Sequence, residues 1–287
     1  MWPKGNGLKE VLSHLKQNLQ TFSAEESDII IDHILYDVAN FSRTDRFIKT
    51  DYLFNESQLV RIKNIIGRLK QNKPIQYITG RAWFYDLEFF VDKWVLIPRP
   101  ETEELVQWIV EDLGEVSNAQ IVEIGTGSGC IAVSLAKKLK NSQISASEIC
   151  ENALNVARIN AEKHSVNVEF FQDDVFSTQA FENQQFDVVV SNPPYVQEYE
   201  KEYIDANVLD YEPHLALFVP DENPLIFYKA IVEFAQKKLR KGGTIYMEIN
   251  HLLANEMMEL MQTNKFENIE LRIDFRSNKR MIKAQKL

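Results

Sequence analysis

The spacing of apolar residues in the first quarter of the chain is that of helices. In residues 1–75 apolar side chains recur every three or four positions, which predicts helices over 8–19, 24–36 and 56–69. Ser23 followed by Glu26 has the pattern of a capping box at the start of the second helix. We therefore expect residues 1–75 to form a small helical domain.

The pattern changes in residues 76–97, which are rich in aromatic and β-branched side chains. Gly80 and Asp86 are turn candidates within this stretch, so it predicts a β-hairpin connector. Pro98 and Pro100 follow, and each proline disfavours a helical conformation for the residue before it. An extended segment should therefore link the hairpin to the rest of the chain.

In residues 98–287, short apolar runs alternate with stretches in which apolar residues recur at helical spacing. This pattern predicts strands alternating with helices. The predicted helices cover 101–113, 128–139, 150–164 and 225–239. The predicted strands cover 119–124, 143–149, 167–171, 186–191, 243–249, 269–274 and 280–285. This order indicates an α/β domain with a mainly parallel sheet and helices on both of its faces.

A glycine-rich loop follows the strand that ends at Ile124. It consists of Gly125, Thr126, Gly127, Ser128 and Gly129. Glycines let a backbone turn tightly and approach a ligand closely, although a purely structural turn uses them in the same way. A dinucleotide fingerprint needs its third glycine one position later, where this chain has Cys130, and no P-loop lysine follows. Because Glu123 precedes the loop and no Lys or Arg lies nearby, the pattern favours a cationic ligand without phosphate, such as S-adenosylmethionine.

Two further acidic positions fit the same ligand. Glu148 ends the next strand, about 20 residues after the loop, where a carboxylate can accept both ribose hydroxyls. Asp174 and Val175 follow the third strand, where Asp174 can accept from the adenine amino group and Val175 can cover the ring. Solvated acids at strand and loop ends are the alternative interpretation of these positions.

A second motif follows the apolar strand 186–191, at the end of the sheet where ligands bind in open α/β folds. It consists of Asn192, Pro193, Pro194 and Tyr195. The two prolines hold φ fixed and offer no competing N–H, and Tyr195 can pack on a planar group. A Pro-Pro turn without a function is the alternative, which the preceding glycine loop makes less attractive.

The chemistry of a planar amide explains these residue types. An amide nitrogen is a poor nucleophile because its lone pair is delocalised into the carbonyl. The Asn192 side-chain oxygen and the Pro193 carbonyl can each accept one of its hydrogens and favour a more nucleophilic geometry. The reaction is then an in-line displacement from the sulfonium, with positioning as its main catalytic contribution. We therefore predict that Asn192, Pro193 and Tyr195 are catalytic.

Charge and composition narrow the class of substrate. The 287 residues carry a net charge of -10, and residues 1–75 hold 11 Lys and Arg against 9 Asp and Glu. The remaining, strongly acidic part argues against broad binding to a phosphate backbone. The two cysteines have no redox or metal spacing, which suits a reducing cytoplasm, and the five histidines show no paired ligand spacing. We expect no metal, no membrane-spanning segment and no direct nucleic-acid substrate.

These residues resemble the HemK/PrmC family, the glutamine methyltransferases of peptide chain release factors. The resemblance extends to the connector, to Tyr211-Glu212-Pro213 and to the helical amino-terminal domain. It implies a class I methyltransferase domain of Rossmann-like type, whose seven-stranded sheet has an antiparallel last strand. It also implies that class 1 release factors are the partners and that the substrate is the glutamine of their GGQ loop. Carried over by position, Gly125 to Gly129, Glu148, Asp174 or Val175, and Asn192 bind cofactor. The resemblance also implies that Asn192, Pro193, Pro194 and Tyr195 bind the glutamine and that Pro98 to Glu101 wall the site.

Two other functions remain open at this stage. A nucleic-acid adenine N(6)-methyltransferase acts on an equally planar amine, although the acidic body and the lack of a basic recognition domain argue against it. A non-catalytic adenosine-binding protein has no need of two acceptors aimed at a methyl group. The position of Glu248 on a late strand is compatible with a structural role or with a place in the pocket.

Overall fold

The computed structural model describes residues 3–114 and 118–287, which form two compact units. The helical unit runs to Arg81 and includes the distant segment Asp205–Tyr211. The sheet unit contains Ala82–Ile204 and Glu212–Leu287. The helical unit therefore extends beyond residue 75, and it takes in a segment that the sequence analysis placed in the domain 98–287.

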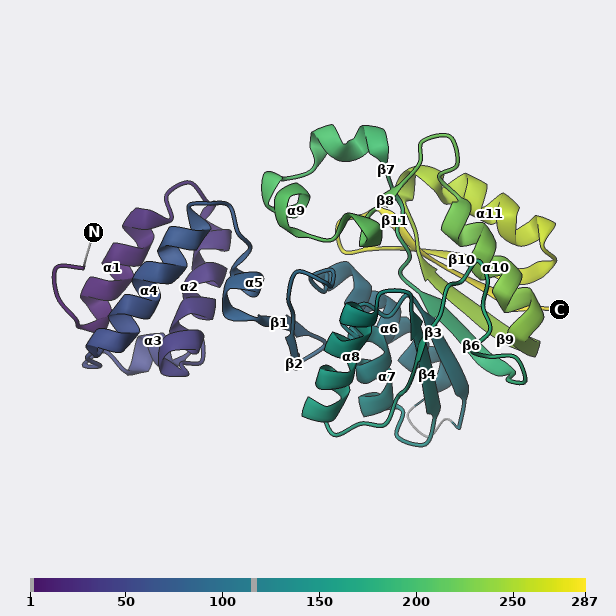
Figure 1. Cartoon of the computed structure of the whole chain (residues 1–287), viewed down its shortest axis with the longest axis horizontal. Helices are drawn as coiled ribbons and strands as arrows, with labels where there is room; N and C mark the ends of the chain where they lie inside the picture. Colours follow the sequence, from purple (N-terminus) through teal and green to yellow (C-terminus); the bar gives the residue numbers. More distant parts are fainter. Residues whose placement is uncertain (1–2, 115–117) are drawn as a thin grey trace. The chain divides into compact units, whose positions relative to one another are not determined.

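Five helices build the amino-terminal part of the helical unit (Figure 1). They are α1 (Leu8–Asn18), α2 (Ala24–Ala39), α3 (Asp45–Ile48), α4 (Glu56–Leu69) and α5 (Ile75–Thr79). The helices predicted over 8–19, 24–36 and 56–69 are confirmed, because their apolar stripes form one buried core. The capping box is also present, since Ser23 accepts from the Glu26 N–H and Glu26 accepts from the Ser23 N–H. The sequence pattern missed α3 and α5, which are too short to show a period.

A two-stranded hairpin follows α5. Its strands are β1 (Arg81–Phe84) and β2 (Leu87–Phe90), and both turn residues, Tyr85 and Asp86, have positive φ. The Asn160 side chain holds the end of the hairpin, because it accepts from the Phe90 N–H and donates to the Phe90 and Ser128 carbonyls. The hairpin is thereby tied to the loop that Ser128 belongs to.

The sheet unit alternates strands with helices over the rest of the chain, with α9 (Ala206–Tyr211) assigned to the helical unit. Its helices are α6 (Pro100–Leu113), α7 (Cys130–Lys138), α8 (Glu151–Lys163), α10 (Ile226–Lys238) and α11 (Ala254–Thr263). The strands of its large sheet are β3 (Gln120–Ile124), β4 (Gln143–Glu148), β5 (Glu169–Gln172), β6 (Phe186–Ser191), β9 (Leu239–Glu248), β10 (Phe266–Ile273) and β11 (Lys279–Lys286). Short strands β7 (Val196–Gln197) and β8 (Phe218–Val219) pair separately. Helix α7 begins two residues later than predicted, because Gly129 has a left-handed conformation.

The large sheet has seven strands in the order β10-β11-β9-β6-β3-β4-β5. Among the described strands of this sheet, β11 alone runs opposite to the other six, which confirms the predicted antiparallel last strand. The chain moves outward from β3 through β4 to β5 and then returns to β6 on the other side of β3. Ligand sites of open α/β sheets lie at such a reversal, beyond the carboxyl ends of the strands.

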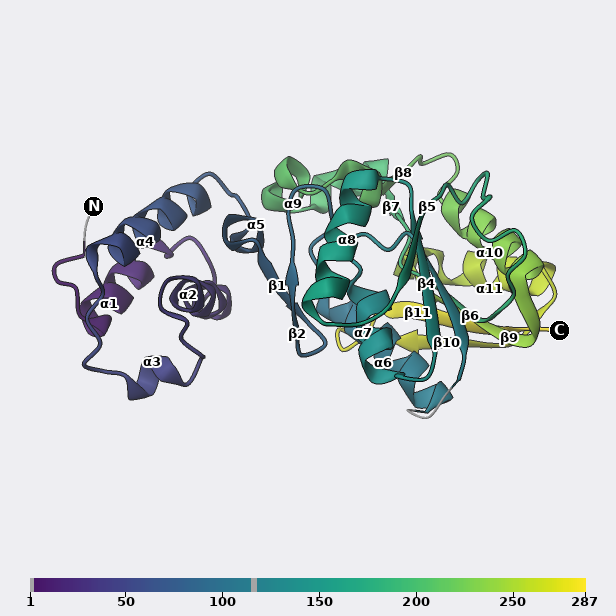
Figure 2. The ribbon, with the colours of Figure 1, turned by 60° about the horizontal axis from the view of Figure 1, so that its bottom comes forward.

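Helices cover both faces of the large sheet, as Figure 2 shows. Helices α6, α7 and α8 pack together on one face, and α10 and α11 pack on the other. The second face contains a large buried cluster in which Tyr228, Val232 and Met257 are fully buried. None of the helices in the described ranges has the length and apolar character needed to cross a membrane.

Candidate active site

A cavity of about 420 Å³ lies in the sheet unit at the carboxyl ends of β3, β4 and β6. Its exposed lining is mostly apolar. Most of the residues predicted as a site line it: Gly125, Thr126, Gly127, Ser128, Glu148, Asp174, Val175, Asn192, Pro193 and Pro194. Gly129 and Tyr195 are not among the lining residues. The fold therefore brings the two motifs, which lie far apart in the sequence, to one cavity.

The glycine loop is shaped by its backbone. Gly125, Gly127 and Gly129 have φ values of 75°, 53° and 79°, which side chains disfavour. The Ser147 carbonyl accepts N–H groups from Gly125 and Thr126 at 2.9 and 3.0 Å, so the loop crosses the end of β4. A Cβ atom at Gly129 would lie 3.1 Å from the Cβ of Ala157. Gly129 therefore serves the close approach of the loop to α8, while Gly127 faces open space.

Glu123, on β3 just before the glycine loop, holds this loop through hydrogen bonds. Its side chain is 1% exposed and accepts from the Thr126 hydroxyl at 2.6 Å and from the Ala132 N–H at 3.0 Å. Burial raises the pKa of the Glu123 carboxyl to about 8, because the charged form loses its hydration. A cation in the cavity would favour the charged form of this group.

Glu148 stands at the end of β4, as predicted. One oxygen accepts from the Gly127 N–H at 2.9 Å and the other from the Cys150 N–H at 3.0 Å. A carboxylate has about four lone-pair sites, so these two bonds fix its orientation and leave acceptors for a ligand. Its predicted role in binding ribose stays a prediction.

The loop after β5 contributes an acid and an aromatic ring, and α10 contributes a second ring. Asp174 lines the cavity and accepts from the Phe176 N–H at 3.0 Å. Asp173 caps the same loop, since it accepts from the Thr178 hydroxyl and the Gln179 N–H. The rings of Phe176 and Phe227 lie 5.2 Å apart at the cavity, and Val175 packs partly against the core. The sequence analysis missed both rings, because Phe227 belongs to α10 and its place at the cavity has no local signal.

Side chains from two distant elements hold the segment after β6. The Asn192 Nδ2 atom donates to Thr102 Oγ1 at 3.1 Å, and the Thr102 hydroxyl donates to Glu248 Oε2 at 2.6 Å. The Tyr195 hydroxyl donates to Glu248 Oε1 at 2.8 Å. Glu248 therefore connects to both ends of the motif. Thr102 lies in the first turn of α6 and was not singled out by the sequence analysis.

Burial governs the protonation of these groups. Glu248 is 1% exposed, and the loss of hydration raises the pKa of its carboxyl. Burial, followed by the nearby Glu248, raises the pKa of the Tyr195 phenol well above its usual value. Tyr195 therefore keeps its proton and acts as a hydrogen-bond donor.

The predicted wall of the site includes an ion pair. Pro98 and Arg99 line the cavity, whereas Pro100 and Glu101 do not. The Arg99 guanidinium lies 2.6 Å from Glu212, whose other oxygen accepts from the Ile97 N–H at 3.1 Å. Arg99 is the only Lys or Arg in the lining formed by the described residues, and it is neutralised by Glu212. The cavity thus offers no free cation for a phosphate.

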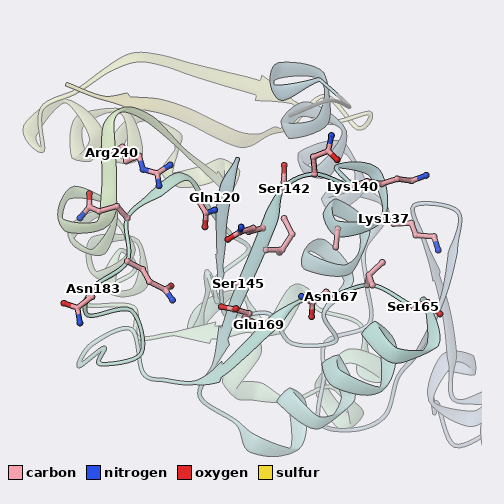
Figure 3. Close-up of a pocket in the computed structure, with 17 residues that line it drawn as sticks. Gln120, Lys137, Lys140, Ser142, Ser145, Ser165, Asn167, Glu169, Asn183 and Arg240 are labelled. Carbon is pink, nitrogen blue, oxygen red and sulfur yellow. The ribbon is translucent and has the colours of Figure 1, made fainter. Parts of the chain in front are cut away.

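A wider, polar depression lies at the opposite end of the strands (Figure 3). Gln120, Ser145, Asn167 and Arg240 are among its lining residues. Arg240 is paired with Asp187 at 2.6 Å. Since ligands of open α/β sheets bind at the carboxyl ends of strands, we take the smaller, apolar cavity as the candidate active site.

Within 3–114 and 118–287, no three His, Cys, Asp or Glu side chains are grouped so that they could hold a metal ion. Cys130 and Cys150 are both free thiols.

The fold and the cavity define a class I methyltransferase. Residues 102–210 match the family described as Methyltransferase small domain, and residues 10–80 match the PrmC N-terminal domain. The 16S rRNA methyltransferase of T. Thermophilus, solved in complex with AdoMet and guanosine, shares this fold with a TM-score of 0.53. That likeness covers 72% of this chain and 50% of that chain at 19% identity, so it concerns the fold alone.

The chain belongs to the release factor glutamine methyltransferase family. It is 43% identical to the release factor glutamine methyltransferase of Flavobacterium psychrophilum over 92% of this chain and 93% of the relative. It is 40% identical to that of Bacteroides thetaiotaomicron over 97% of this chain and 100% of the relative. The resemblance stated from the motifs is thereby confirmed.

Proposed function

We propose that this protein transfers a methyl group from S-adenosylmethionine to the side-chain amide nitrogen of the glutamine in the GGQ loop of class 1 release factors. The observation that carries the proposal is the side-chain amide of Asn192, whose nitrogen is bound by Thr102 beside the glycine loop. Because the nitrogen is engaged, the Asn192 oxygen is left as an acceptor for a substrate amide. The membership of this chain in the release factor glutamine methyltransferase family supports this choice of substrate.

The residues of the cavity fit S-adenosylmethionine. Gly125 and Gly127 leave open space for a ligand beside the loop, and Glu123 and Glu148 carry the carboxyl groups that suit a cation and hydroxyls. Asp174 and the Phe176–Phe227 pair suit a planar base. When bound, this cofactor supplies a methyl group activated by a sulfonium. The mostly apolar lining favours a reaction that transfers charge away from that sulfonium.

The chain's own residues orient the nucleophile. The Asn192 oxygen and the Pro193 carbonyl accept the two hydrogens of the substrate amide, which opposes delocalisation of its lone pair. Pro193 and Pro194 keep this backbone in one conformation. Tyr195 does not line the cavity and its hydroxyl is bound to Glu248, so its proposed contact with the planar group requires the substrate to reach past the two prolines. No strong base is required, because the methylated nitrogen is acidic and loses its proton late.

The helical unit is the proposed release-factor-binding part of the protein. Its match to the PrmC N-terminal domain over residues 10–80 supports this role. The unit also presents apolar side chains to solvent, with Phe47 67% and Ile48 70% exposed. Such side chains are typical of surfaces that bind other proteins. We place the reaction in the cytoplasm, where release factors act.

The test is methyl transfer from labelled S-adenosylmethionine to purified release factor. The controls are the same factor with the GGQ glutamine replaced by alanine, and a duplex DNA. We expect label on the unmodified release factor alone. Label on the DNA would instead support the adenine N(6)-methyltransferase, and label on the alanine variant would show that another residue is the acceptor.

A further inference from the structure

Adjacent strands bring Glu248 level with the Asn192–Tyr195 segment. Ser191 at the end of β6 is paired with Met247 on β9, so the next residue of each strand, Asn192 and Glu248, lies at the same edge of the sheet. The Glu248 carboxylate then accepts from the Tyr195 hydroxyl through Oε1 and from the Thr102 hydroxyl through Oε2. One side chain from a different strand is thus connected to both ends of the motif, directly to Tyr195 and through Thr102 to Asn192.

The direction of these hydrogen bonds, from donor to acceptor, determines which end of the Asn192 side-chain amide faces Thr102. Glu248 accepts from both hydroxyls, and in its charged form, which the nearby Arg280 favours, it can only accept. The single hydroxyl hydrogen of Thr102 therefore points to Glu248. The Thr102 oxygen is then left as an acceptor, and only the nitrogen side of the Asn192 amide can bind it. The reversed amide would place its oxygen against the oxygen of Thr102. The order Glu248, Thr102, Asn192 therefore selects the orientation in which the Asn192 oxygen is free.

The cost of burying these groups indicates more than a packing role. Glu248 and Thr102 are 1% and 2% exposed, and the Arg280 guanidinium lies 5.8 Å from the ring centre of Tyr195. A buried carboxyl costs free energy unless all of its partners are present, and apolar residues of similar size are usually cheaper. Asn192 accepts no hydrogen bond from the described residues, so the network ends at a free acceptor beside the cavity.

We propose that Glu248 and Thr102 are positioning residues that hold the Asn192 side-chain oxygen toward the substrate amide and fix Tyr195 at the same time. The inference rests on the proposed function for its catalytic consequence. In the free protein, Thr102 orders the Asn192 amide before any ligand binds.

The kinetic test uses the full-length protein with Thr102→Val, which keeps the shape of the side chain and removes its hydroxyl. We expect kcat for release factor methylation to fall about 100-fold, because a misplaced acceptor loses most of its effect. The Kd for S-adenosylmethionine should stay within about twofold, since the glycine loop is untouched. Thr102→Ser, which restores the hydroxyl, should return kcat to within about threefold of wild type.

The matched control is Ser134→Ala. Ser134 is fully buried in α7 of the same unit, and its hydroxyl has no hydrogen-bond partner within the described part of the chain. Its removal should leave both kcat and the Kd for S-adenosylmethionine unchanged. A fall of kcat in this control as large as that in Thr102→Val would show that any lost buried hydroxyl slows the enzyme, and would overturn the proposal.

Glu248→Gln tests the other half of the network. A glutamine has one accepting and one donating end, so it can no longer accept from both hydroxyls. We expect about a tenfold loss of kcat with an unchanged Kd for S-adenosylmethionine. Wild-type kcat in this variant would contradict the role assigned to Glu248.

A nuclear magnetic resonance measurement separates this inference from the proposed function. In the ligand-free protein the Asn192 side-chain amide hydrogens should exchange slowly, and Thr102→Val should accelerate their exchange at least about tenfold, whereas Thr102→Ser should not. Equal exchange in wild type and Thr102→Val would refute the network. A wild-type protein that transfers no methyl group to the release factor would refute the proposed function, and the exchange result would still decide the orientation of Asn192.

Discussion

The glycine loop and the Asn192–Pro194 segment border the same cavity, but different kinds of contact hold them. The loop is held mainly by backbone groups: the Ser147 carbonyl binds two of its N–H groups, and Gly129 packs directly on Ala157. Asn192 is held by a chain of side chains that begins at Thr102, 90 residues away, and continues to Glu248. Backbone contacts tolerate side-chain changes, whereas a side-chain network can be broken by removing one hydroxyl. The cofactor half of the site should therefore respond through folding and binding, and the substrate half through turnover.

The largest effect is expected for Asn192→Ala, which removes the proposed acceptor from the substrate half. Methyl transfer should fall at least about 1000-fold, because a donor or acceptor present in the transition state is lost. Binding of S-adenosylmethionine, measured by calorimetry, should weaken only a few-fold. Unchanged turnover in this variant would disprove the catalytic role of Asn192.

Gly129→Ala should disturb the cofactor half through the backbone. The new Cβ atom would lie 3.1 Å from the Cβ of Ala157 at a φ of 79°, so we expect a loss of about 2–4 kcal/mol in the free energy of unfolding. The matched control is Gly67→Ala on the exposed side of α4, where nothing lies within 4 Å of the new atom. That change should stabilise the protein by about 0.5–1 kcal/mol. Chemical denaturation measures both, and equal effects would show that the loop does not depend on close packing.

Tyr195→Phe tests whether the side-chain network of the substrate half affects turnover. The buried Glu248 carboxylate would lose one of its two donors, which should cost about 1–3 kcal/mol of stability and about tenfold in kcat. Tyr246→Phe is a suitable control. Tyr246 lies on β9 of the same sheet but outside the cavity lining, and the change removes a hydroxyl that is hydrogen-bonded to Asp112 of α6. It should lower stability without changing kcat. A parallel loss of kcat in the control would mean that reduced stability alone explains the effect.

A further prediction concerns the pH dependence of stability and involves Glu123. Its folded pKa of about 8 lies above the ordinary value of 4.5, so the folded state holds an extra proton between these values. Stability from this group is complete below pH 4.5 and is lost as pH rises to about 8. Between pH 5 and pH 8 the wild type should lose up to about 1.4 kcal/mol per pH unit more than Glu123→Gln. Thermal unfolding of both proteins across this range checks the prediction, which parallel curves would contradict.

Much of the fold was visible in the sequence. The period of Leu8, Val11 and Leu15 predicted α1, and the strand predicted over 186–191 coincides with β6. The misses have two different causes. α11 contains buried Met257 and Met261 but no strong start signal, and the short α9 belongs to the helical unit through contacts such as the Tyr211 hydroxyl to the Gln71 carbonyl. Contacts between residues so far apart in the chain leave no periodic trace.

The sequence by itself determined the glycine loop, the Asn192–Tyr195 motif and the succession of strands and helices along the chain. These features are local, because glycine and proline restrict or free their own backbone and apolar periods follow from strand and helix geometry. The tertiary structure alone decided that Thr102 binds Asn192, that Glu248 belongs to this network and that Phe227 reaches the cavity. Each of these contacts depends on the pairing of β6 with β9 and on the packing of α6 and α10 against the sheet. Such residues are brought together by the order of the strands within the sheet and by their register. No short stretch of the chain specifies either of these.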